Sequence, residues 1–129
     1  MHNPVFNHLS QQLALAVGGS EHLASGRGTR FRTVWFTRLT AYHENVAEGN
    51  NAEVAFHPQS LGQSTGISET DIRLQINHLR ASTAREINFN LQQRWPRVGV
   101  RTAEDVALVI AFIDSMLAIA RTRRQRVAA

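Results

Sequence analysis

The stretch from Thr102 to Arg126 constrains the fold of this chain more than any other part of the sequence. Its residues from Val106 to Ile113 are apolar without a break, and the apolar pattern continues to Ala120. A surface helix has one apolar stripe, whereas this one is apolar on nearly every side and must be covered on most of them. A chain of 129 residues has few layers with which to cover it, so we expect copies of the chain to share the helix. The predicted interface residues are Val109, Phe112, Ile113 and Met116.

Both ends of this helix are marked in the sequence. Thr102 is a favourable N-cap, and the carboxylate of Asp105 can accept hydrogen bonds from unpaired backbone N–H groups of the first turn. The other end carries Arg121, Arg123, Arg124 and Arg126. The helix dipole accounts for one or two of these, so the tail is a predicted contact for an anionic partner, with a solvated basic tail as the alternative. Asp114, inside the apolar run, is predicted to pair with an arginine across the interface between copies; a buried functional carboxylate is the alternative.

Helical periodicity predicts three further helices. Asn3 caps the first, which begins at Pro4 and ends before Gly18. The second covers residues 30–48, where an apolar stripe persists from residue 31 to residue 46. Strict alternation over residues 30–36 also suits a strand, and we favour a helix because the stripe continues. The third begins after Ser68, with Asp71 as its capping partner, and extends to residue 95.

The predicted fold is therefore all-α: a single domain of about four helices, arranged as a helical bundle. Residues 1–49 form the N-terminal helices with a basic helical arm, residues 50–67 a long irregular connection, and residues 68–129 the C-terminal helical part. The irregular connection is expected to be a surface arm, with a short extended piece at Val54 and Phe56. Residues 98–100 are expected to be a short connection into the terminal helix.

Charge points to a polyanionic partner. The formal net charge is +4 with a pI near 11.2, and all fourteen basic residues are arginine. A GC-rich genome explains this bias; selection for planar guanidinium groups that bind phosphate bidentately explains it equally well. Besides the tail arginines, a second arginine cluster in residues 27–38 is interleaved with aromatic residues. Two more arginines lie on the predicted outward face of the helix that follows Ser68. With the tail, the predicted nucleic-acid-binding residues are Arg27, Arg30, Arg32, Arg38, Arg73, Arg80, Arg121, Arg123, Arg124 and Arg126.

Several classes of function are disfavoured by what the sequence lacks. Without cysteine there is no disulfide, no thiolate nucleophile and no Cys-based metal site. The six histidines show no metal-binding spacing and there is no GxSxG, so we expect no metal, no cofactor and no enzymatic activity. No signal peptide is recognisable, and the apolar run is shorter than the ~20 residues that span a bilayer. We therefore expect a virion or cytoplasmic protein that is not secreted by a signal peptide and has no membrane span.

The order of features resembles a known family. The run GRGTRFRTVWFTRL, the long helix that follows Ser68 and the apolar closing helix are similar to the coat (major capsid) proteins of filamentous archaeal viruses, which wrap double-stranded DNA in A-form. The resemblance implies a basic helical arm that encloses DNA and a C-terminal helical bundle that builds the outer wall. It also implies that Arg27, Arg30, Arg32 and Arg38 face the DNA.

Two hypotheses of function follow. The first is a self-assembling coat or nucleoprotein subunit, which binds the phosphate backbone through arginines and oligomerises with itself or a paralogous subunit. Duplex DNA is the favoured nucleic acid and RNA the alternative. The second is a non-enzymatic protein-interaction or assembly factor, of the phage or secretion-system type, that binds no nucleic acid.

Overall fold

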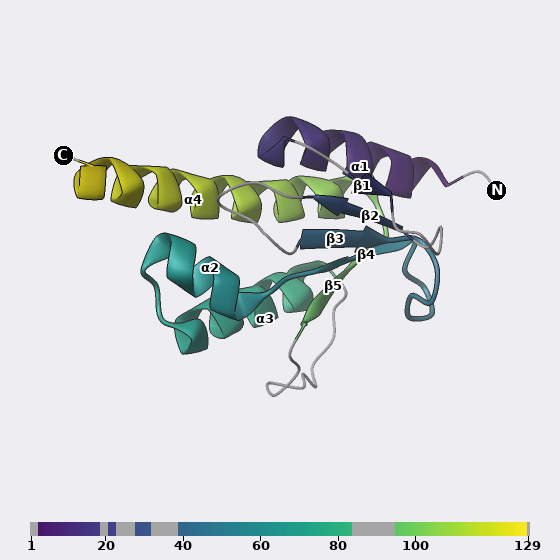
Figure 1. The fold of residues 1–129 in the computed structure, drawn as a ribbon. Coiled ribbons are helices and arrows are strands. Elements are labelled where there is room, and N and C mark those ends of the chain that lie inside the picture. Colours follow the sequence, from purple (N-terminus) through teal and green to yellow (C-terminus); the bar gives the residue numbers. More distant parts are fainter. Residues whose placement is uncertain (1–2, 19–20, 23–27, 32–38, 84–94, 129) are drawn as a thin grey trace.

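A five-stranded antiparallel sheet, with helices packed against it, organises the molecule (Figure 1). This computed structural model describes residues 3–18, 21–22, 28–31, 39–83 and 95–128. The elements are α1 (Pro4–Val17), β1 (Glu21–His22), β2 (Gly28–Phe31), β3 (Leu39–Tyr42), β4 (Ala52–Ala55), α2 (Pro58–Thr65), α3 (Glu69–Thr83), β5 (Arg97–Val100) and α4 (Ala103–Ala128). The strands lie in chain order, and α2 and α3 form the connection between β4 and β5. The prediction of an all-α bundle is therefore wrong, because the protein is mixed α and β.

Strand register separates an apolar face of the sheet from a polar one. Thr29, Ala41, Val54 and Val98 are direct partners in successive strands, so they form one row across the sheet. Side chains alternate between faces along each strand, which places the buried Phe31 and Leu39 on the same face as this row. The opposite face carries the polar positions: Arg30, Thr40, Tyr42, Glu53 and Arg97.

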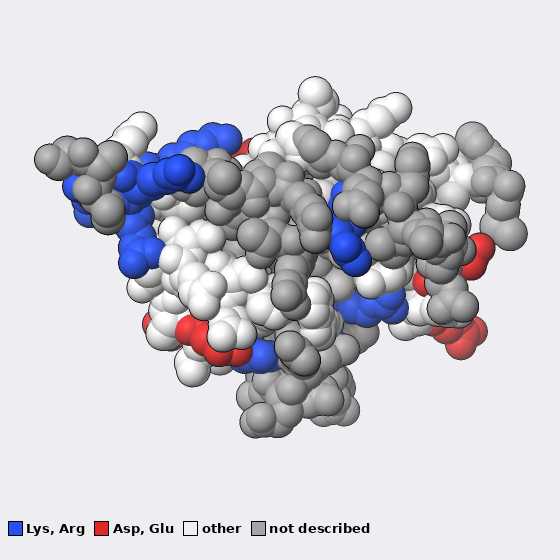
Figure 2. All heavy atoms as spheres, in the orientation of Figure 1, with Lys and Arg blue, Asp and Glu red and all other residues white. Residues whose placement is uncertain are grey.

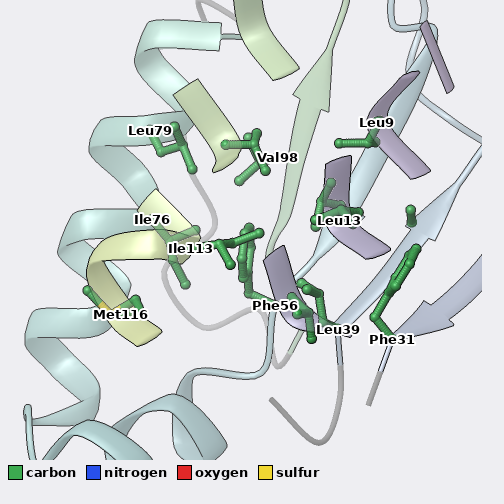
Figure 3. Packing of buried hydrophobic residues seen from close by; sticks show 14 of the residues in the cluster. Leu9, Leu13, Phe31, Leu39, Phe56, Ile76, Leu79, Val98, Ile113 and Met116 are labelled. Atoms are coloured by element: carbon green, nitrogen blue, oxygen red, sulfur yellow. The ribbon is translucent and has the colours of Figure 1, made fainter. Parts of the chain in front are cut away.

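The hydrophobic core lies between the apolar face of the sheet and three helices. α1 contacts β2 and β3, α3 contacts β5, and α4 contacts all three other helices. Figure 3 shows Ile113 of α4 between Ile76 of α3 and Leu13 of α1, with Phe56 beside it. All four of these side chains are fully buried. The long apolar helix is thus covered by the sheet and the helices of its own chain.

The predicted helix over residues 30–48 is wrong where the structure describes it. Residues 28–31 and 39–42 are strands paired with each other, and residues 43–51 form a loop; residues 32–38 lie outside the described part. Apolar residues that form a stripe with helical period also fit the strand pair, since Phe31 and Leu39 are direct partners in β2 and β3. Gly28 permits the pairing, because a Cβ there would lie 2.1 Å from the carbonyl oxygen of Ala41. The basic helical arm implied by the family resemblance is likewise absent from these residues.

The segment predicted to be irregular contains regular structure. Residues 50–67 include β4 and α2, so the extended piece at Val54 is confirmed, and the backbone N–H of Phe56 donates to the carbonyl of Pro96. Residues 98–100, predicted as a connection, belong to β5. The Ser68 cap of α3 is confirmed, since its hydroxyl accepts from the N–H of Asp71 at 3.1 Å. α3 ends at Thr83, and residues 84–94 of the predicted long helix lie outside the described part.

The predicted caps of α1 and α4 are confirmed. The side chain of Asn3 accepts from the N–H of Phe6, and Pro4 is the first residue of α1. At α4, Asp105 Oδ2 accepts from the N–H groups of Arg101 at 2.9 Å and Thr102 at 3.2 Å, while Thr102 Oγ1 accepts from the N–H of Asp105. None of the helices in the described segments combines the length and apolar character needed to cross a membrane.

Replacing Asp105 by alanine should lower the free energy of unfolding by about 1–2 kcal/mol, because two N–H donors in partly buried hydrogen bonds lose their acceptor. Glu104→Ala is the matched control, since this neighbouring acid lies in the same first turn but is exposed. Urea unfolding followed by circular dichroism measures both. An equal effect of the two variants would mean that the helix dipole, and not the hydrogen bonds of Asp105, stabilises the start of α4.

Candidate functional site

The C-terminal end of α4 carries the densest group of positive charge in the described part of the chain. Residues 121–126 are all exposed, and the last turns of the helix project beyond α2 (Figure 1). Figure 2 shows the blue arginine surface gathered at this end. We call the four side chains there the arginine tip: Arg121, Arg123, Arg124 and Arg126. The structure thus brings together the tail residues that the sequence singled out.

Helix geometry divides the arginine tip into two sides. At about 100° per residue, Arg121 and Arg124 lie near each other on one side of α4. Arg123 and Arg126 lie on another side, which faces α2, because both line a groove that includes Thr65 of that helix. The tip therefore presents guanidinium groups around most of the circumference of the helix.

Arg123 is held against the end of α2. Its Nη1 donates to the carbonyl oxygen of Gln63 at 2.5 Å, so a cation sits at the negative end of that helix. Gly66 ends α2 in the left-handed conformation, with φ at 80°, and a Cβ at this position would lie 3.0 Å from Arg123 Nε. This contact fixes the end of α4 relative to α2.

An open groove of about 480 Å³ lies between α2 and α4 beneath these arginines. Its lining residues are Thr65, Ala118, Ile119, Thr122, Arg123 and Arg126. The hydroxyls already have acceptors, since Thr65 Oγ1 donates to the carbonyl of Leu61 and Thr122 Oγ1 donates to that of Ala118. The groove therefore combines an apolar floor with two guanidinium groups. We call it the α2–α4 groove; sequence reasoning missed it, because Thr65 and Ile119 come together only through the packing of α2 on α4.

The predicted cluster around residues 27–38 is described at one position. Arg30 lies half-buried on the polar face of the sheet, opposite Thr40 in the neighbouring strand. Arg27, Arg32 and Arg38 lie outside the described residues. Their predicted contact with nucleic acid stays a prediction.

The two arginines of α3 do not form the outward cationic face that was predicted. Arg73 is half-buried and paired with the carboxylate of Glu69 at 3.1 Å. Arg80 is only 8% exposed, because it follows Ile76 by one turn on the side of α3 that faces the core. The buried side of α3 is wider than its apolar stripe, since the helix packs against β5, α2 and α4 together.

The predicted interface residues on α4 lie within the chain's own fold. Val109, Ile113 and Met116 are buried in the core, and Phe112 is partly buried with its ring 5.3 Å from that of Phe56. The sheet, which was not predicted, helps to bury these residues within one chain. A second copy is therefore not needed to cover the apolar helix. Asp114 is exposed on the single chain, so the alternative of a buried functional carboxylate is wrong, and its pairing with an arginine of another copy stays a prediction.

A polar network on the far face of the sheet was not predicted. Glu53, 5% exposed, accepts from the N–H of Ala47 at 2.7 Å, from Asn50 Nδ2 at 2.9 Å and from Arg97 Nη1 at 3.0 Å. The guanidinium of Arg97 lies 4.0 Å from the centre of the Tyr42 ring. These groups satisfy one another and hold the loop after β3, which is a structural role. A lone carboxylate between Ala52 and Val54 is the signal that could have revealed it.

Two histidines, His43 and His57, pack against aromatic rings. His57 caps α2 through Nδ1, which accepts from the N–H of Ser60, and its ring lies 4.7 Å from that of Trp95. In the part of the chain that the structure describes, no group of three His, Asp or Glu side chains could hold a metal ion.

No protein-family model matches the chain, and comparisons with curated proteins and with solved structures gave no match. The arginine tip and the α2–α4 groove are thus the features on which a function can be argued.

Proposed function

We propose that this chain is a non-enzymatic structural protein of the virion or cytoplasm that binds the phosphate backbone of nucleic acid through its arginine tip. The observation that carries the proposal is the exposure of all four arginine residues on a helix end that projects from the body. An arginine side chain keeps its charge at every physiological pH and donates two parallel hydrogen bonds to a phosphate.

The arrangement supports backbone contact over base reading. Phosphate contacts fix a protein on nucleic acid without carrying sequence information. Guanidinium groups distributed around a helix end suit several phosphates, and the net charge of +4 favours association with a polyanion. We expect weak sequence dependence and strong salt dependence, with duplex DNA the preferred ligand and RNA the alternative.

The test is a gel-shift series over salt concentration with duplex DNA and RNA of matched length. Combined substitution of Arg121, Arg124 and Arg126 by serine should reduce the slope of log affinity against log salt by about 2–3 for duplex DNA, since each lost phosphate contact contributes about 0.9. Arg123 is left intact because it also holds α2.

The matched control lowers the net charge by the same amount elsewhere. Asn7→Asp, Gln11→Glu and Gln75→Glu are changes at exposed positions of α1 and α3. This variant should keep most of the salt slope. An equal decrease of the salt slope in both variants would mean that net charge alone accounts for the effect. If no nucleic acid were retarded at low salt, the proposal would be refuted.

A further inference from the structure

Ile119 is an apolar side chain that the fold leaves uncovered at a charged site. It is 39% exposed and forms part of the floor of the α2–α4 groove, beside Arg123 and Arg126. In the described residues, the other exposed large apolar side chains are Leu15, Leu74 and Leu108. Ile119 differs from a scattered surface residue because it lies in a concave site with two cations at its edge.

The chemistry of the groove specifies its occupant. The two threonine hydroxyls donate to backbone carbonyls within their own helices, so the guanidinium groups are the charged donors that its described lining offers. The apolar lining residues are Ala118 and Ile119. A complementary ligand carries an apolar side chain next to a carboxylate. A nucleic-acid duplex presents its phosphates outward but keeps the apolar faces of its bases inside the stack, away from Ile119.

The outward stripe of α3 has this complementary chemistry. Leu74 is 48% exposed, and Asp71, which precedes it by three residues, is also exposed. Residues three apart are neighbours on a helix surface, so the carboxylate and the apolar side chain lie side by side. Figure 2 shows an acidic red patch at the same end of the molecule as the arginine tip, and Glu69 and Asp71 begin α3.

We propose that the α2–α4 groove binds the α3 stripe of a second copy of this chain. Leu74 of one copy packs against Ala118 and Ile119 of the other, and Asp71 pairs with Arg126. This contact shares Arg126 with the arginine tip but requires no nucleic acid, and it replaces the buried α4 residues as the surface through which copies associate. Since groove and stripe are different patches, two copies can pair reciprocally or successive copies can join head to tail.

Sedimentation velocity on nuclease-treated protein, over a range of concentrations, tests the proposal. The natural chain should associate, and Ile119→Ser and Leu74→Ser should each weaken the association by about ten-fold or more, because burial of the apolar side chain is lost. Leu108→Ser, at a position of similar exposure, and Leu15→Ser, at a more exposed one, both lie outside the groove and stripe and should leave it unchanged. All four positions are at least 39% exposed, and circular dichroism verifies that each variant is folded.

A charge exchange identifies the pairing. Asp71→Arg and Arg126→Asp should each weaken association, whereas an equimolar mixture of the two variants should associate through the restored ion pair. A natural chain that stays monomeric at every concentration would overturn the proposal, and so would association that the Ile119 and Leu74 variants retain. Loss of nucleic-acid affinity in Ile119→Ser, with the natural chain monomeric, would assign the groove to nucleic acid instead.

Discussion

Ile113→Ala is expected to lower the free energy of unfolding by about 3–4 kcal/mol, and by the same amount at every protein concentration. Ile113 is fully buried within the single chain, between α1 and α3 (Figure 3). Removing its outer carbons loses their burial and leaves a cavity that packed neighbours fill only in part. Because the lost contacts are all within one molecule, the loss does not depend on association.

Thermal and urea unfolding at several protein concentrations measure this effect. Leu108→Ala is the matched control, since Leu108 lies on the same helix and is 43% exposed; its substitution should cost less than about 0.5 kcal/mol. If the stability of the natural chain rose with concentration and Ile113→Ala abolished that rise, Ile113 would lie between copies, as the sequence suggested, and the packing in Figure 3 would be incorrect.

Helix ends were predictable because their signals are local. Asn3 with Pro4, Ser68 with Asp71, and Thr102 with Asp105 each satisfy backbone donors within one turn, and each forms the predicted hydrogen bond. A few adjacent residues contain all the information needed, so the first residues of α1, α3 and α4 follow from the sequence.

The sheet was not predictable in the same way. β2, β3, β4 and β5 have four residues each, too few for a period of two to be distinguished from a period of 3.6. Their stability comes from cross-strand partners that are distant in sequence, such as Val54 and Val98. The propensities of neighbouring residues contain no information about which distant strands pair.

The burial of α4 was overestimated for a specific reason. Its exposed face includes Ala107, Ala111 and Ala118, which count as apolar in a pattern but leave little hydrocarbon in contact with water. Exposure of such small side chains is ordinary in a soluble protein. The large side chains Val109, Ile113 and Met116 form a one-sided stripe, which α1, α3 and the sheet cover.

The arginine tip was predictable from composition, and the α2–α4 groove was not. Four arginines among six consecutive residues near the end of a helix are visible in the sequence, and their exposure follows from the excess of charge. The groove depends on the contact between Arg123 and Gln63, which joins two helices separated by α3 and β5. Only the tertiary arrangement brings its apolar floor and its cations together.

Glu53→Ala is expected to lower the free energy of unfolding by about 3 kcal/mol. Its carboxylate accepts hydrogen bonds from Arg97, Asn50 and the backbone of Ala47, and all three donors lose this acceptor, although Arg97 Nη1 keeps the carbonyl oxygen of Asn45. Removal of one partner of a buried ion pair costs about 3–5 kcal/mol. The lower end applies here because the side chain of Arg97 is 28% exposed and water can still reach its guanidinium.

Two comparisons isolate the role of the charge. Glu69→Ala removes a glutamate that also pairs with an arginine, but at an exposed site, and should cost under about 1 kcal/mol. In a double-mutant cycle with Arg97→Met, the sum of the two single losses should exceed the loss in the double variant, because each single substitution already removes the ion pair between Glu53 and Arg97. The amide of Ala47 should exchange faster with solvent in Glu53→Ala. Additive losses with unchanged exchange at Ala47 would show that Glu53 stabilises β4 by packing alone and does not hold the loop after β3.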